Sequence, residues 1–307
     1  MSGEPDTVPA MVMAEPEFAL DRRAVRRSFA AAARHYEQSA WLQRQVRTDL
    51  LDRLRFFSLA PQHILDLGAG TCQATAELRR RFPRAQVVAV DLAEAMLRAA
   101  ARPRWPWQAR ATRVCADARQ LPVAAGSIDL IYSNLMLQWC DQPLEVFGEL
   151  ARVLKPGGLL LFSTLGPDTL QELRGAWAVA DDDRHVSLFL DMPQLGDALA
   201  RAGFAEPVLD VEHYRRHYPD AQTLMHELKQ LGARNAMRAR ARGLTGRGRL
   251  AAMLAAYEQL RTAQGVPATF EVIAGAAFGA AAGMHSRQRA RSGEVAIPLS
   301  AIKRPRP

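Results

Sequence analysis

The chain has 307 residues, of which 49% are apolar, and a formal net charge of +8. This length can bury one sizeable core, or one core with a small appendage. No apolar run is long enough to span a membrane, and the acidic stretch from Met1 to Glu17 is unlike a secretory signal. The three cysteines have neither metal-ligand nor disulfide spacing, so we expect a cytoplasmic protein without a bound metal.

The first expected elements are helices. Residues 1–19 are expected to be a disordered lead, and apolar residues at helical spacing predict two helices between 20 and 59. From 60 to 166, short apolar runs alternate with helical patterns, which is typical of βαβ units around a parallel sheet. The expected strands cover residues 63–67, 86–91, 112–116, 128–133 and 159–165.

Helices separate these strands. Asp141 is a candidate N-cap for the third of them, with Pro143 in its first turn. The sequence Lys155-Pro156-Gly157-Gly158 ends that helix and leads into the fifth strand. The three helices are expected at residues 72–82, 93–101 and 142–154.

The rest of the chain is mainly helical in pattern. Residues 167–283 contain four helical patterns and two strands, and residues 284–307 form a basic tail that is expected to be disordered. The helices are expected at 168–178, 192–202, 220–231 and 247–263, and the strands at 207–214 and 269–274. Residues 20–283 therefore predict one α/β domain. Its sheet is Rossmann-like with helices on both faces, an N-terminal helical lid and a helical insertion after strand five.

A glycine-rich turn after the first strand is the most informative motif. Asp66 lies in that strand, and Gly68-Ala69-Gly70 follow, where glycine lets a ligand approach the backbone closely. Asp91 ends the second strand and can accept both hydroxyls of a ribose. The turn lacks the dinucleotide pattern, and Asp66 suits a positive ligand better than a pyrophosphate. An adenosine with a cationic centre fits, which indicates S-adenosylmethionine. The alternative is that Asp66 only caps a structural turn.

Other candidates for this pocket follow the remaining strands, because ligands of open α/β sheets bind at the carboxyl edge. Asp117 follows the third strand and is placed to meet an adenine amino group, although an acid in a turn is an equal alternative. Asn134 follows the fourth strand and is placed to contact the cofactor. The remaining expected cofactor-binding residues are Leu92, Met96, Ala118 and Leu135.

Motifs for other chemistry are absent from the sequence. It has neither the G-x-S-x-G elbow of hydrolases nor a phosphate-binding P-loop. Gln138 and Trp139 are candidates to line a substrate pocket, with core packing as the alternative for Trp139. His213 and His217 are four residues apart, but they lie in an expected strand that leads into a turn, so we predict no zinc site there.

Arginine supplies nearly all of the positive charge. Two segments are strongly basic: Arg22–Arg27 in the first helix, and Arg234–Arg249, which contains no acid. Such patches attract acidic macromolecules, although a codon bias toward arginine also explains the composition. The sequence has no recognition motif for nucleic acid, so we do not expect that partner.

These motifs resemble class I S-adenosylmethionine-dependent methyltransferases. Within that superfamily, residues 22–278 are similar to the malonyl-[acyl-carrier protein] O-methyltransferases of biotin synthesis. Cys72 departs from the pattern, because such enzymes often have a third glycine there. The blocks that carry the narrower likeness are Phe29–Glu37, Leu42–Gln45, Gln138–Cys140, Phe162–Leu170, Gly243–Arg247 and Pro267–Glu271.

The resemblance implies methylation of the free carboxylate of malonyl-[acyl-carrier protein] with S-adenosylmethionine as donor. The carboxylate is already ionised at pH 7, so alignment rather than a general base is required. Tyr36 and His35 of the lid, with Gln138 and Trp139, are expected to enclose the malonyl group; the alternative for Tyr36 is packing of the lid. Arg247 is the candidate anchor for the carboxylate. The acidic carrier is expected to meet the two basic segments.

Two alternatives stay open at this point. One keeps the fold and methylates another small acid or a quinone precursor. The other resembles the complex I assembly factor that hydroxylates arginine, which shares the Gly166–Leu170 and Pro267–Thr269 types of block. The blocks His35–Gln38 and Leu42–Gln45 favour the biotin enzymes over this second alternative.

Overall fold

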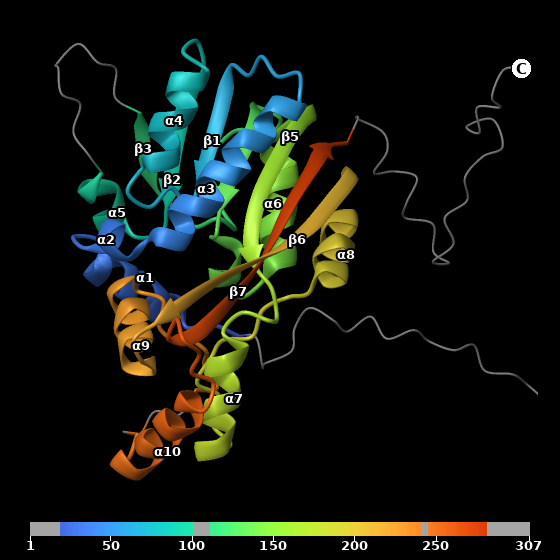
Figure 1. Ribbon diagram of the computed structural model, residues 1–307. Coiled ribbons are helices and arrows are strands. Elements are labelled where there is room, and N and C mark those ends of the chain that lie inside the picture. Colours follow the sequence, from blue (N-terminus) through green and yellow to red (C-terminus); the bar gives the residue numbers. More distant parts are fainter. Residues whose placement is uncertain (1–18, 101–110, 241–242, 244, 281–307) are drawn as a thin grey trace, which may run out of the picture.

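A seven-stranded sheet forms the centre of the computed structural model, which describes residues 19–100, 111–240, 243 and 245–280 (Figure 1). The strand order is β3-β2-β1-β4-β5-β7-β6. β1 to β5 are parallel, and β7 runs antiparallel between β5 and β6. The strands are β1 (His63–Leu67), β2 (Gln86–Asp91), β3 (Thr112–Cys115), β4 (Ile128–Asn134), β5 (Leu154–Leu165), β6 (Phe204–Tyr218) and β7 (Val266–Gly279).

Helices precede, connect and follow these strands. A short 3-10 helix at Leu54–Phe56 leads toward β1, and another at Leu137–Trp139 follows β4. In the described ranges, no helix is both long and apolar enough to cross a membrane. The helices are α1 (Arg22–Ala32), α2 (Tyr36–Ser39), α3 (Trp41–Arg53), α4 (Gln73–Arg81), α5 (Glu94–Ala99), α6 (Pro143–Val153), α7 (Gln171–Ala180), α8 (Met192–Ala202), α9 (Ala221–Gln230) and α10 (Arg247–Glu258).

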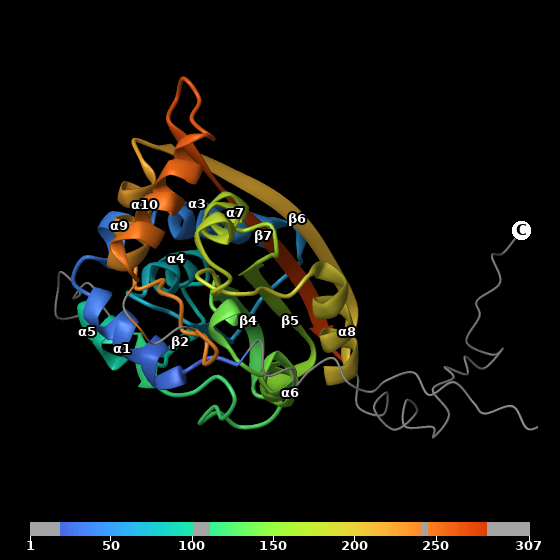
Figure 2. The same cartoon turned by 90° about the horizontal axis from the view of Figure 1, so that it is seen from below.

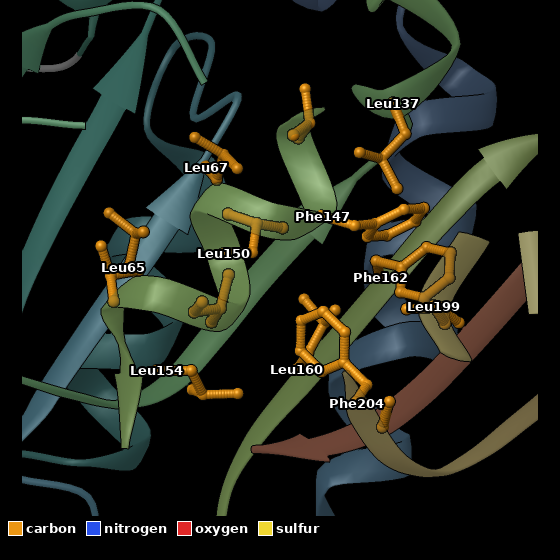
Figure 3. Packing of buried hydrophobic residues seen from close by; sticks show 14 of the residues in the cluster. Leu65, Leu67, Leu137, Phe147, Leu150, Leu154, Leu160, Phe162, Leu199 and Phe204 are labelled. Carbon is orange, nitrogen blue, oxygen red and sulfur yellow. The ribbon is translucent and has the colours of Figure 1, made fainter. Parts of the chain in front are cut away.

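Both faces of the sheet are covered, as the apolar strands predict. Successive strand residues point to opposite faces, so Ile64 packs with α3 and α4 while Leu65 packs with α6 and α8. Figure 3 shows the ring of Phe147 from α6 beside that of Phe162 from β5, with their centroids 5.7 Å apart. Each such large side chain contributes about 1.5–3 kcal/mol when fully buried. The Rossmann-like fold with helices on both faces is confirmed.

A second core lies where β7 and β6 extend beyond the parallel strands (Figures 1 and 2). Here Leu173 of α7, Leu224 of α9 and Tyr257 of α10 pack against β7 and against Leu42 of α3. The Tyr257 hydroxyl donates to the Pro267 carbonyl oxygen at 2.8 Å. The helical insertion is thereby held against the N-terminal helices.

Several expected boundaries differ from the structure. β6 and β7 are longer than the expected strands because they pair with each other along nearly their whole length. α10 ends at Glu258 rather than near 263. Asp141 is not the N-cap of α6; Gln142 occupies that position without a side-chain hydrogen bond, and Asp141 instead lies 3.8 Å from the Arg119 guanidinium. The expected disordered ends lie outside the described residues, apart from Ala19.

The topology also positions a crevice. The strand order reverses between β1 and β4, since the chain builds outward from β1 in one direction to β3 and in the other to β5. Ligands of open α/β sheets bind at the carboxyl ends of strands at such a switch point. The turn after β1 and the segment after β4 both begin there.

Candidate functional site

The glycine turn after β1 is held against β2 by its backbone. The amides of Gly68 and Ala69 both donate to the Val90 carbonyl oxygen, at 2.8 and 3.0 Å. Gly68 has φ +72°, and a Cβ there would lie 2.3 Å from the Met136 Cγ. Glycine is therefore required at this position by close packing with the segment after β4, in addition to any ligand.

Cys72 ends the same turn in a left-handed conformation, with φ +62°. Its side chain is buried in a cluster with Ala69, Ala89 and Leu97. Burial raises the pKa of this thiol. The departure from the usual third glycine therefore places the thiol in the core, and Cys72 lines neither of the two hollows described below.

A hollow of about 800 Å³, open to solvent, lies at the carboxyl ends of β1, β2 and β4. We call it the first hollow. α1 covers it with Arg22, Val25 and Phe29. Most residues that the sequence analysis assigned to cofactor binding line it: Gly68, Gly70, Asp91, Leu92, Met96, Asp117, Ala118, Asn134 and Leu135. Asp66 and Ala69 do not.

Asp91 is fixed in the first hollow by two backbone amides. Its carboxylate accepts hydrogen bonds from the Gly70 amide at 2.9 Å and from the Ala93 amide at 2.8 Å. Burial raises the pKa of this carboxyl, and the two amide hydrogen bonds act in the opposite direction. Three segments, the turn, the end of β2 and the start of α5, are thus joined by one carboxylate that faces the hollow.

Asp66 lies beneath the turn. It is 2% exposed, and its carboxylate accepts a hydrogen bond from the Thr75 hydroxyl. Burial raises its pKa to about 7, against the opposing effect of the Thr75 hydrogen bond. The side chain therefore couples the end of β1 to α4, and it does not line the first hollow.

Two further assigned residues are engaged with protein groups. Asp117 forms an ion pair with Arg22 of α1, and its carboxylate accepts from the Arg119 amide at 3.0 Å. The Asn134 side chain accepts from the Ser163 hydroxyl at 2.9 Å and donates to the Gln43 carbonyl oxygen at 3.0 Å. Both residues thus connect the first hollow to the N-terminal helices.

A second hollow, of about 880 Å³, lies between the N-terminal helices and the insertion. Its wall includes Gln43 of α3, Gln138, Phe270 of β7, and Arg234 beyond α9. Four side chains line both hollows: Phe29, Tyr36, Leu135 and Trp139. We call these four the shared wall.

The shared wall is built on an aromatic cluster. The Phe29 ring lies 5.1 Å from Trp139 in an edge-on arrangement and 6.4 Å from Tyr36. Burial, with smaller contributions from Glu37 and Asp91, raises the pKa of Tyr36 well above its usual value. Its hydroxyl therefore stays protonated and can donate a hydrogen bond. Glu37, the next residue, accepts from the Thr71 hydroxyl and so ties α2 to the glycine turn.

Comparison with known proteins identifies the family of this chain. A family profile described as "Methyltransferase domain" matches residues 65–162. The malonyl-[acyl-carrier protein] O-methyltransferase of Methylovorus sp. is 48% identical over 273 residues, covering 87% of this chain and 92% of that protein. The protein of the same name from Gallionella capsiferriformans is 44% identical over 268 residues, covering 85% and 92%. The chain belongs to the malonyl-[acyl-carrier protein] O-methyltransferase family.

Solved structures resemble this family member in fold. A putative methyltransferase from Bacillus halodurans has a TM-score of 0.54 and 17% identity, covering 76% of this chain and 100% of its own. The YcgJ protein of a Bacillus species has a TM-score of 0.54 and 15% identity, with coverages of 76% and 99%. At these identities the likeness concerns the fold alone.

Only some of the residues expected around the substrate lie together in the structure. Tyr36, Gln138 and Trp139 line the second hollow. His35 and Arg247 are exposed and line neither hollow, so the structure does not support them around the malonyl group. Arg247 is the first residue of α10, which lies beside α7 and packs with it in the second core (Figure 1).

Two lining residues, Arg22 and Gln43, are not predicted by the sequence. Arg22 belongs to a basic segment, which predicts only a surface charge, yet it lies over the first hollow. Gln43 lay in the block Leu42–Gln45 that favoured the family, but nothing in the pattern showed which face of α3 meets the hollow. In each case the missing information was the packing of an N-terminal helix on the sheet edge.

Asp66 makes the stability of the fold depend on pH. Its pKa is higher in the folded than in the unfolded chain, so it favours folding at low pH and loses that contribution as pH rises from about 4 to about 7. We compare the free energy of unfolding of Asp66→Asn with that of the parent. The difference should shift in favour of the variant by about 2 kcal/mol when the pH is raised from about 5 to about 8. Urea unfolding at both pH values measures this difference.

Asp220→Asn is the matched control. The pKa of Asp220 is lowered, mainly by the Thr223 amide, so its carboxyl is ionised throughout this range. Its stability difference from the parent should therefore stay constant. A constant difference for Asp66→Asn as well would contradict the assignment of a raised pKa to Asp66.

Proposed function

We propose that this protein transfers a methyl group from S-adenosylmethionine to the free carboxylate of a malonyl group on acyl-carrier protein. The product is the methyl ester that primes pimeloyl synthesis for biotin. The observation that carries the proposal is the shared wall, because two hollows that meet at one wall bring a methyl donor and an acceptor together. The names of relatives that are up to 48% identical support the choice of acceptor.

The first hollow has the chemistry that S-adenosylmethionine requires. Asp91 presents a fixed carboxylate to ribose hydroxyls, and Asp117 lies where the adenine would end. Val90, Leu92 and Met96 supply an apolar lining for the nucleoside. When bound, S-adenosylmethionine supplies an electrophilic methyl group on a positively charged sulfur.

The protein residues then need only to orient the carboxylate and exclude water. A malonyl carboxylate is ionised at pH 7, so one of its oxygens can bond to the methyl carbon as the sulfur–carbon bond breaks, and no proton moves. In this proposal the Tyr36 hydroxyl donates to that carboxylate, and Phe29 and Trp139 exclude water; all three line both hollows. Orienting two reactants in this way can supply about 7–11 kcal/mol.

A basic surface lies beside the second hollow. The two basic segments, distant in sequence, meet there: the Asp21 amide donates to the Ala236 carbonyl oxygen at 2.7 Å, and the Arg238 amide donates to that of Ala19 at 2.8 Å. We call five exposed arginines of α1 and of the segment just after α9 the carrier surface, and propose that it attracts the acidic carrier. They are Arg23, Arg26, Arg27, Arg234 and Arg238.

The rest of the expected basic segments is less suited to this role. Arg22 is paired with Asp117, and Arg249 lies 3.3 and 3.2 Å from the carboxylates of Asp181 and Asp183. Arg242 lies outside the described residues. We therefore propose a smaller docking surface than the one the sequence predicted.

Mass spectrometry of malonyl-[acyl-carrier protein] after incubation with S-adenosylmethionine tests the reaction directly. We expect the carrier to gain the mass of one methyl ester, because the free carboxylate is the acceptor. Acetyl-[acyl-carrier protein], which lacks that carboxylate, should be unchanged. Methylation of both carriers, or of neither, would contradict the proposed acceptor.

Tyr36→Phe tests the hydroxyl at the shared wall. A hydrogen bond to a charged group is worth about 1.5–3 kcal/mol, so we expect kcat/KM for malonyl-[acyl-carrier protein] to fall about tenfold or more. Calorimetric binding of S-adenosylmethionine should change little. Arg247→Ala and His35→Ala serve as controls and should stay within about twofold of the parent; equal losses in all three variants would refute the role of Tyr36.

Charge reversal tests the carrier surface. We expect Arg26→Glu with Arg27→Glu to raise KM for malonyl-[acyl-carrier protein] several-fold and to reduce its salt dependence, because screening weakens steering by exposed charges. KM for malonyl–coenzyme A should change much less. Arg84→Glu is the control. Arg84 is exposed just before β2, at the amino ends of the parallel strands, whereas the two hollows lie at or beyond their carboxyl ends. An equal effect on both substrates would exclude docking at this surface.

A further inference from the structure

The second hollow is lined differently at its two ends. Near the shared wall, its polar groups are neutral: the Tyr36 hydroxyl and the side-chain amides of Gln43 and Gln138. The charged lining residues lie on the insertion side. Of these, Glu227 accepts from the Tyr218 hydroxyl at 2.7 Å, and His185 lies 2.8 Å from an Asp181 carboxylate oxygen.

Gln43 is fixed beside the shared wall. Its carbonyl oxygen accepts from the Asn134 side chain at 3.0 Å, and Asn134 immediately precedes Leu135 of the wall. This bond joins α3 to the end of β4, so the position of Gln43 is set by the sheet. Its side chain faces the second hollow.

One polar atom of Gln43 is unused. Its side-chain oxygen is buried and has no hydrogen-bond partner among the described residues. A buried polar group without a partner is costly, and its presence calls for an explanation. Gln138, in contrast, donates to the Leu135 carbonyl oxygen at 2.8 Å and accepts weakly from the Thr164 hydroxyl at 3.4 Å.

We propose that Gln43 binds the malonyl carboxylate through its side-chain amide, alongside Tyr36. Rotation of the amide by half a turn exchanges its oxygen and nitrogen, so the buried position then presents N–H donors to the acceptor. This inference rests on the proposed function and deepens it: the acceptor carboxylate is held by neutral donors at the shared wall, and no arginine anchors it there.

Neutral donors suit a carboxylate that must act as a nucleophile. A bidentate arginine would form a strong charge-assisted pair with both oxygens and oppose their attack on the methyl group. Arg234, an arginine of the second hollow, is exposed and belongs to the segment that pairs with the residues just before α1. Its place is with the carrier surface, at the outer end of the hollow.

Two substitutions of Gln43 test this role. Gln43→Leu removes the donor, and we expect KM for malonyl-[acyl-carrier protein] to rise about tenfold. Gln43→Glu keeps the shape but places a negative charge beside the substrate carboxylate, and a larger rise, of about a hundredfold, is expected. The neutral methyl-ester product should inhibit the Gln43→Glu variant as well as it inhibits the parent, because it carries no charge to repel.

Gln45→Leu is the matched control on the same helix. Gln45 is exposed and donates weakly to Asp49 at 3.3 Å. It should leave KM unchanged, and calorimetric affinity for S-adenosylmethionine should stay within about threefold in all three variants. If Gln43→Leu binds S-adenosylmethionine normally and keeps the parental KM, the inference is wrong. If the parent itself does not methylate the malonyl carrier, the proposed function fails instead.

Discussion

The carboxylate of Asp91 is the constraint on which the site depends. By accepting from the Gly70 and Ala93 amides, it fixes the turn after β1 relative to the end of β2 and the start of α5. β1 and β2 are parallel neighbours in the sheet, so the position of this acid follows from the topology. The sheet and its turns thereby provide the floor of the first hollow, and the N-terminal helices and the insertion form its cover and the second hollow.

The N-terminal helices and the insertion complete the site through a small number of contacts. α1 covers the first hollow and is held by backbone hydrogen bonds to the segment after α9. Glu37 and Asn134 tie α2 and α3 to the sheet edge. The second hollow exists because α7, α9 and α10 pack on the part of β7 that extends past the parallel strands. A minimal Rossmann-like domain would lack this hollow, and with it the acceptor site proposed above.

The sequence predicted the sheet well because apolar runs and glycine turns are local signals. Asp91 and Gly70 could be placed at a shared edge since parallel strands end together. His35 and Arg247 could not be judged in this way, because their positions depend on how α2 and α10 pack on distant segments. Arg247 follows the long β6, whose length came from pairing with β7 rather than from its own composition. Gln43 was overlooked for the same reason: a helical pattern does not tell which neighbour its polar residues meet.

The backbone hydrogen bonds between residues 19–21 and 236–238 have a consequence for carrier docking. They place the carrier surface on the outer side of the same helix that covers the first hollow. If an acidic carrier docks on this surface, it presses on the cover of the donor site. Carrier docking and exchange of the donor would then be coupled through α1. That coupling would run through the contact between residues 19–21 and residues 236–238.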